Sequence, residues 1–181
     1  LGDVYKRQMI YFSLHSEKDG LYPQDAIYYT YANADFSDVE IIPKRLFEYP
    51  YPTIDADIVL DEAGIYHLFF NTWGGADGLL RRQYMFTDLH DQDKWRLVEG
   101  RMQPNDIASE GSCAYPLAGG EWILVYDCFR DGFSQFCRSK DLIQFELVRT
   151  TSMDKGAFSP RHGTVIQITE KEFEILKKRY K

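Results

Sequence analysis

The sequence predicts an all-β protein built from repeated four-stranded units, the architecture of a β-propeller. Short apolar and aromatic runs alternate with Gly, Pro, Asn and Asp turns, and the aromatic content of 15% suits strands. An Asp followed by a large apolar residue recurs every 53 residues, at Asp35-Phe36, Asp88-Leu89 and Asp141-Leu142. Four-stranded repeats of roughly 40–50 residues are typical of propeller blades.

The first unit is shorter than the others and lacks a leading strand. Its expected strands are 9–14, 26–31 and 41–47. The last of these contains Pro43 and is therefore expected at a sheet edge. Residues 1–8 show no strand periodicity, and we expect them to be a non-native or disordered tail on a partial propeller domain at 9–181. The chain is thus expected to lack the N-terminal part of a larger, closed propeller.

The second and third units each follow the same four-strand plan. The expected strands of the second unit are 53–60, 65–72, 80–86 and 95–98. Those of the third unit are 108–117, 121–128, 133–138 and 145–149. Trp95 and Phe145 open the matching last strands, so the two units are read as complete blades.

A fourth unit is expected to contribute only its first strand, at 163–168. The stretch Thr169-Glu170-Lys171-Glu172 that follows has the pattern of a helix capping box. Phe173, Leu176 and Tyr180 are spaced to lie on one face of a helix. A short terminal helix is therefore predicted.

The charge of the chain narrows the classes of partner. The net charge is −7, which argues against nucleic acid and acidic membrane surfaces. No apolar run approaches the ~18 residues of a membrane span.

The three cysteines, Cys113, Cys128 and Cys137, lack the spacing of a zinc site and are expected to be free thiols. A neutral ligand fits this composition best, and the oligomeric state is left open.

Three stretches place candidate catalytic side chains at near-even spacing. The apolar run 53–60 contains Asp55 and Asp57, and a carboxylate in an apolar strand is costly unless it is paired or used. Glu110 follows 55 residues after Asp55, and His162 follows 52 residues after Glu110. First strands of blades line the central channel, so we expect these three side chains to occupy the same position in successive blades and to converge. Two carboxylates and a histidine suit acid–base cleavage of a glycosidic bond.

These stretches also resemble a known enzyme family. Ile54-Asp55-Ala56-Asp57, Ser109-Glu110-Gly111 and Arg161-His162-Gly163-Thr164-Val165 are similar, in order and spacing, to motifs of glycoside hydrolase family 43. That family comprises five-bladed β-propellers and includes α-L-arabinofuranosidases, endo-arabinanases and β-xylosidases. The resemblance implies an inverting hydrolase of arabinose- or xylose-containing plant polysaccharides or oligosaccharides. It implies no required cofactor, calcium on the axis in some members, and a secreted or periplasmic location.

The resemblance implies a role for each matching residue. Glu110 matches the general acid, and Asp55 matches the aspartate that tunes the pKa of that acid and orients it. His162 matches a histidine on the propeller axis, near calcium in some members, and Arg161 is expected to reach a substrate hydroxyl or to pair with an acid. The general base of the family is an aspartate of the first blade and has no counterpart here. We therefore expect this chain alone to turn over little substrate.

Other interpretations of these residues stay open. Asp57 has the same strand parity as Asp55 and is a second candidate for the catalytic aspartate. Glu110 could be a solvated loop acid, and His162 a core histidine. The Gly-Ser after Glu110 departs from the Gly-Pro or Ala-Pro of many family members. The alternatives for the whole protein are a non-catalytic glycan-binding or scaffold propeller and a retaining fructan hydrolase, whose two carboxyl groups lie only ~5–5.5 Å apart.

Overall fold

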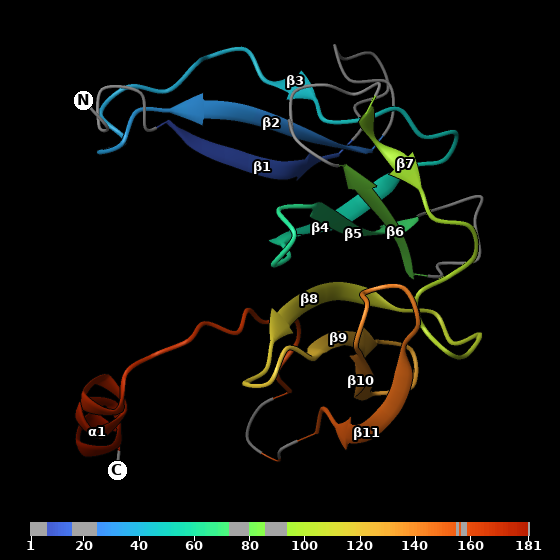
Figure 1. The fold of residues 1–181 in the computed structure, drawn as a ribbon, viewed down its shortest axis with the longest axis vertical. Helices are drawn as coiled ribbons and strands as arrows, with labels where there is room; N and C mark the ends of the chain where they lie inside the picture. Colours follow the sequence, from blue (N-terminus) through green and yellow to red (C-terminus); the bar gives the residue numbers. More distant parts are fainter. Residues whose placement is uncertain are drawn as a thin grey trace.

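The computed structural model describes residues 7–15, 25–72, 80–85, 94–154, 156 and 159–180, without the side chains of 81, 82, 84 and 85. Within this part of the chain the fold is all-β apart from one helix, as expected. Its strands form three antiparallel sheets that succeed one another along the chain (Figure 1).

The first sheet has three strands in the order β1-β2-β3. These strands are β1 (Gln8–Leu14), β2 (Ala26–Ala32) and β3 (Lys44–Arg45). The strand expected at 41–47 is much shorter in the structure, because only Lys44 and Arg45 pair with β2. Pro43, which lacks an amide N–H, directly precedes this edge strand, in keeping with the rule that proline is confined to edges.

The second and third sheets have four strands each, and all eight were predicted to within a few residues. The second sheet comprises β4 (Thr53–Leu60), β5 (Tyr66–Thr72), β6 (Leu80–Met85) and β7 (Arg96–Leu97). The third comprises β8 (Glu110–Pro116), β9 (Trp122–Cys128), β10 (Phe133–Ser139) and β11 (Glu146–Ser152). Each is a meander in which sequential strands pair.

The internal repeat is visible in the backbone. Phe36 follows β2 with φ 59°, and Leu142 follows β10 with φ 57°. The preceding carboxylates cap both turns, since Asp35 accepts the amide of Ser37 at 3.1 Å and Asp141 accepts the amide of Ile143 at 2.8 Å. The strands β1–β3 therefore correspond to the last three strands of the third sheet. The third copy, Asp88-Leu89, lies outside the described residues.

Two hydrophobic cores join the three sheets, one at each junction. Strand β5 serves both: Leu68 and Phe70 pack against the first sheet, and Phe69 packs against the third. Alternate side chains of a strand point to opposite faces, so a middle strand packed on both sides is buried along most of its length, its polar residues His67 and Asn71 included. The sheets do not close into a ring among the described residues, and a complete propeller therefore stays a prediction.

The C-terminal region differs from the expectation in one respect. Residues 163–168 are extended but form no strand, because no described strand pairs with them. The helix α1 (Glu170–Arg179) follows, as predicted, and begins with the capping box: Thr169 accepts the Glu172 amide at 3.3 Å, and Glu172 accepts the Thr169 amide at 2.8 Å. This helix buries none of its residues and extends away from the sheets (Figure 1).

Several smaller expectations can also be checked. Cys113, Cys128 and Cys137 are buried and free. No described helix is long and apolar enough to cross a bilayer.

Candidate active site

Asp55 occupies a β-bulge in the middle of β4. The pairing of β4 with β5 jumps from Ile54 to Asp57, and Asp55 has a left-handed φ of 56°. Asp is among the few non-glycine residues that tolerate this conformation. The bulge sends the Asp55 carboxylate to the third sheet, where Oδ2 accepts the amide of Gly111 at 2.9 Å. The bulge therefore brings an acid of the second sheet beside Glu110 of the third.

The same bulge recurs at the start of β8. Glu110 pairs with Asp127 and the register then jumps to Cys113, with Gly111 at φ 64°. Matching the two bulges places Gly111 where β4 has Asp55, and Glu110 where β4 has Ile54. Asp55 and Glu110 were expected at the same blade position, and that expectation is wrong by one residue. Sequence spacing could not reveal this offset, because the pairing with β5 and β9 sets the register.

Neighbouring sheets satisfy the backbone groups that the bulge leaves unpaired. The Asp55 amide donates to Ser13 Oγ at 3.2 Å, and Ser112 Oγ donates to the Asp55 carbonyl at 3.4 Å. These bonds anchor the bulge to both the first and the third sheet. An anchored bulge limits the freedom of the Asp55 carboxylate, which is the condition for placing a functional group.

Arg161 and His162 lie against Glu110. The Arg161 guanidinium forms an ion pair with the Glu110 carboxylate, and His162 Nε2 lies 3.7 Å from Glu110 Oε1. Only 15% of the Glu110 side chain is exposed. The structure therefore brings Arg161, His162 and Glu110 together although 163–168 is not a strand, and of the two contacts left open for Arg161 it contains the pairing with an acid.

Asp127 is a fourth member of this cluster that the sequence analysis missed. It lies on β9 opposite Glu110, and its Oδ2 accepts the backbone amide of His162 at 3.0 Å. The same oxygen lies 3.3 Å from Arg161 Nε and 3.4 Å from His162 Nδ1. An acid inside the apolar run at 122–128 was the available signal, the same one that singled out Asp55.

Gly111 makes room for the histidine. A Cβ atom added at Gly111 would overlap the His162 ring at Nδ1. Gly111 also has a positive φ, so a side chain would be disfavoured by its backbone as well. The glycine after Glu110 is thus explained by two independent constraints.

An open hollow lies over this cluster. It has a volume of about 420 Å³ and is lined by Asp55, Ala56, Gly111, Ser112, His162, Gly163 and Thr164. Glu110 does not line it, since Arg161 lies against that carboxylate. Asp55 and His162 are the ionisable side chains of its lining, and the Glu110 carboxylate lies directly beside it, 3.7 Å from the His162 ring.

Asp57 has a different position from Asp55. Its Oδ2 accepts the amide of Ala114 at 2.6 Å and so ties β4 to β8. Burial raises the pKa of Asp57 to about 6. Asp57 is absent from the lining of the hollow, so its geometry favours an inter-sheet role.

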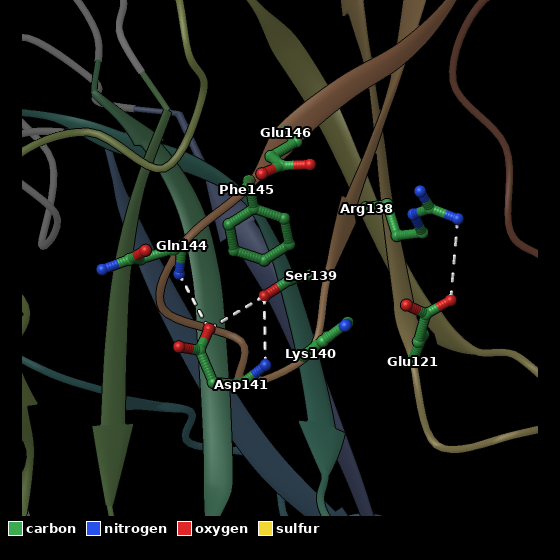
Figure 2. Close-up of a pocket in the computed structure, with 8 residues that line it drawn as sticks. All are labelled: Glu121, Arg138, Ser139, Lys140, Asp141, Gln144, Phe145 and Glu146. Atoms are coloured by element: carbon green, nitrogen blue, oxygen red, sulfur yellow. Dashed lines mark hydrogen bonds and ion pairs between the residues drawn. The ribbon is translucent and has the colours of Figure 1, made fainter.

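A second hollow of about 460 Å³ lies at the opposite end of the third sheet (Figure 2). Asp141 accepts hydrogen bonds there from Ser139 Oγ at 3.0 Å and the Gln144 amide at 2.9 Å, while Arg138 and Glu121 approach to 3.7 Å. Ser139, Asp141 and Gln144 thus bond to one another within the turn after β10, while Arg138 of β10 pairs with Glu121, which precedes β9. The chemistry of the first hollow makes it the stronger candidate.

The cluster does not fit the axial calcium that some family 43 members hold. Calcium prefers several oxygen ligands. Both ring nitrogens of His162 face carboxylates, and the permanent positive charge of Arg161 shares those carboxylates. No described group of His, Cys, Asp and Glu side chains is arranged to hold a metal ion.

Comparison with known proteins identifies the class. The profile of a family described as a probable glycosyl hydrolase domain, related to glycoside hydrolase family 43, matches residues 3–174. The chain therefore belongs to this family-43-related glycosyl hydrolase family. No curated protein matches it.

Solved structures support the same fold. A thermostable family-43 glycoside hydrolase aligns with a TM-score of 0.63 at 15% identity, over 88% of this chain and 57% of its own length. An endo-1,4-β-xylanase from Bacteroides thetaiotaomicron aligns with a TM-score of 0.54 at 12% identity, over 87% and 60%.

A third structure is described as a member of the GH130 family of mannoside phosphorylases, which contains glycoside hydrolases that target β-1,2 mannosidic linkages in Candida mannan. It aligns with a TM-score of 0.59 at 14% identity, over 86% of this chain and 49% of its own length. At these identities the likeness concerns the fold alone. The chain spans about half to three-fifths of the length of these structures.

Proposed function

We propose that this chain is part of an inverting glycoside hydrolase, a five-bladed β-propeller that acts on arabinose- or xylose-containing plant polysaccharides or oligosaccharides. Glu110 is the general acid, and Asp55 orients it and tunes its pKa. The observation that carries the proposal is the bond from the Gly111 amide to Asp55 Oδ2. It ties the Asp55 carboxylate to the residue that follows Glu110, which supports these two roles in a chain that belongs to a glycosyl hydrolase family.

The chemistry follows from the charges around Glu110. A general acid must carry a proton before it can protonate the leaving oxygen, and nearby negative charge favours the protonated form. Asp55 supplies such charge from the neighbouring sheet. In an inverting enzyme a second carboxylate activates water on the opposite face of the sugar, ~6.5–9.5 Å away. That base is proposed to come from a part of the protein beyond these sheets.

The test is hydrolysis of aryl arabinofuranosides and xylosides, and of the corresponding oligosaccharides, by this chain and by the longer protein to which we propose it belongs. Glu110→Gln should lower kcat/KM on an unactivated oligosaccharide by roughly 10²–10⁴-fold. A dinitrophenyl glycoside, whose leaving group needs little protonation, should be affected far less. Glu121→Gln, at the other end of the third sheet, is the matched control. Near-normal hydrolysis of the oligosaccharide by Glu110→Gln would refute the assignment.

The stereochemistry separates this proposal from a retaining hydrolase. The first-formed sugar should have the inverted anomeric configuration, which ¹H NMR detects before mutarotation. A product of retained configuration would indicate a covalent intermediate and a closer carboxyl pair.

One observation favours a second candidate, a glycan-binding protein without catalysis. Arg161 is paired with Glu110, and an ion-paired carboxylate holds its proton weakly. In that case oligosaccharides should bind at the hollow without turnover, and Glu110→Gln should leave the Kd unchanged. Calorimetry with a xylo-oligosaccharide and an arabino-oligosaccharide distinguishes the two candidates.

A further inference from the structure

Asp127 is a buried acid to which the proposed mechanism assigns no role. Only 4% of the residue is exposed, and it interrupts an otherwise apolar stretch of β9. Its Oδ1 accepts the hydroxyl of Ser134 at 3.1 Å, so that oxygen is satisfied within the sheet. Its Oδ2 faces the segment that carries Arg161 and His162. The acid therefore connects the sheet to the proposed site.

The fold does not require a charge at this position. Ile54 pairs with Asn71 in the second sheet as Glu110 pairs with Asp127 in the third. Asn71 is as deeply buried as Asp127 but carries a neutral amide. Because the second sheet forms with a neutral amide at this position, the third sheet does not need the charge of Asp127 in order to form.

Arg161 and His162 each contact both acids. Arg161 reaches Glu110 through Nη2 and Asp127 through Nε, and His162 approaches Glu110 through Nε2 and Asp127 through Nδ1. The ring of Phe129 lies 5.9 Å from the Arg161 guanidinium carbon. The Asp127 carboxylate also accepts the His162 backbone amide, and this bond does not depend on the side-chain conformation of Arg161 or His162. The segment is thus held at two successive residues.

The charges explain what this arrangement does. With both carboxylates ionised and His162 neutral, Glu110, Asp127 and Arg161 together carry one net negative charge. Protonating Glu110 brings that sum to zero, and Arg161 then remains paired with Asp127. Asp55, which bonds to the amide next to Glu110, adds negative charge from β4. Without the charge of Asp127, Arg161 would balance Glu110 alone and would favour its ionised form.

We propose that Asp127 is a positioning residue: it holds Arg161 and His162 over Glu110 and allows Glu110 to take up a proton while Arg161 stays in place. The role in catalysis rests on the proposed function, but the positioning and the proton affinity do not. Asp127 itself has no contact with substrate in the proposed mechanism; it acts through Arg161, His162 and Glu110 and is not a catalytic residue.

The test is an NMR titration of this chain with ¹³C-labelled glutamate carboxyl groups and ¹⁵N-labelled arginine. Glu110→Gln assigns the Glu110 signal. In Asp127→Asn we expect the titration midpoint of Glu110 to fall by roughly one pH unit, because a nearby negative charge is removed. The Arg161 Nε–H signal should also exchange faster with water, since one of its two carboxylate partners is gone.

Ser134→Ala is the matched control, because it removes the other hydrogen bond of Asp127 and leaves the charge. It should leave both signals unchanged. The proposal is wrong if the titration midpoint of Glu110 in Asp127→Asn equals or exceeds that in the original chain. It is also wrong if the Arg161 Nε–H exchanges with water at an unaltered rate.

A second variant covers the case in which Asp127→Asn does not fold. Arg161 lies on an exposed segment, and Arg161→Gln should raise the Glu110 midpoint because Asp127 then faces Glu110 without the cation. An unchanged midpoint in a folded Arg161→Gln protein would equally contradict the proposal.

Activity gives a separate readout. If the protein hydrolyses glycosides, Asp127→Asn should move the alkaline limb of its kcat/KM profile to lower pH, because Glu110 would lose its proton sooner. If the longer protein hydrolyses no glycoside but the titrations behave as expected, the proposed function fails and the positioning role of Asp127 stands.

Discussion

At the scale of the residue, the site depends on two positions of left-handed backbone. Asp55 uses that conformation to send its carboxylate to the neighbouring sheet. Gly111, at the same place in the next sheet, uses it to leave room for the His162 ring. One bulge geometry thus serves two purposes, according to whether the residue carries a side chain.

Gly111→Ala is therefore expected to displace His162 and weaken or abolish ligand binding. Its backbone strain alone should cost about 1–2 kcal/mol. Gly64→Ala is the matched control, since Gly64 has φ 80° but no atom lies within 4 Å of an added Cβ. The His162 ring signals in an NMR spectrum and the free energies of unfolding of both variants measure the difference. Unchanged ring signals in Gly111→Ala would contradict the close contact.

Asp57 should make stability depend on pH. Burial raises its pKa in the folded protein to about 6 from the ordinary 3.8, so the folded state binds the extra proton between these values. Stability from this group is therefore full below about pH 4 and is lost as pH rises through 6. The loss is at most about 3 kcal/mol.

Asp57→Asn removes this titration and keeps the side-chain oxygen that accepts the Ala114 amide. Urea unfolding of both proteins between pH 4 and 7 gives the comparison. The variant should gain stability relative to the original chain as the pH rises. A difference that is constant with pH would rule out Asp57 as the source.

At the scale of the element, α1 stands apart from the sheets. Its capping box is complete, yet none of its residues is buried. Its stability therefore comes from local interactions, namely the cap and the i,i+3 pair of Glu174 with Lys177.

Thr169→Ala should reduce the helicity of α1 without changing the unfolding of the sheets. Loss of an N-cap costs about 1 kcal/mol. Because α1 does not pack on the sheets, this loss should not lower their stability. Circular dichroism at 222 nm and the aromatic near-ultraviolet signal report the two parts separately. Thr150→Ala, on exposed β11, serves as a control. A lower melting temperature of the near-ultraviolet signal in Thr169→Ala would show that the helix packs on the fold.

At the scale of the whole molecule, stability lies in the two cores between the sheets. Phe69 belongs to the core between the second and third sheets and meets Phe145 edge-on at 6.0 Å. Phe70, the next residue, belongs to the other core and lies 5.0 Å from Phe47. Adjacent residues of one strand thus hold different pairs of sheets together.

Phe69→Ala and Phe70→Ala should each destabilise the protein by about 3–5 kcal/mol, because each leaves a cavity in a closed core. Hydrogen exchange should locate the loss differently. In Phe69→Ala the backbone amides of β8–β11 should lose protection first, and in Phe70→Ala those of β1 and β2 should do so. Identical exchange patterns would mean that the three sheets unfold as one unit.

The strands were predictable because their signals are local. Alternation, turn residues and the recurrent Asp act within a few neighbours, and so does the capping box of Thr169. The strand expected at 163–168 failed because strand formation depends on a partner, and a run of β-branched residues says nothing about whether one is near.

The sequence by itself determined the strand plan, the repeat, the terminal helix and the resemblance that named Asp55, Glu110, Arg161 and His162. Tertiary structure alone decided how these groups meet. Strand pairing set the one-residue offset between the two bulges, and the fold placed Asp127 beside Arg161 at a separation of 34 residues. Such contacts depend on register and on packing between sheets, and no local pattern of residues encodes either.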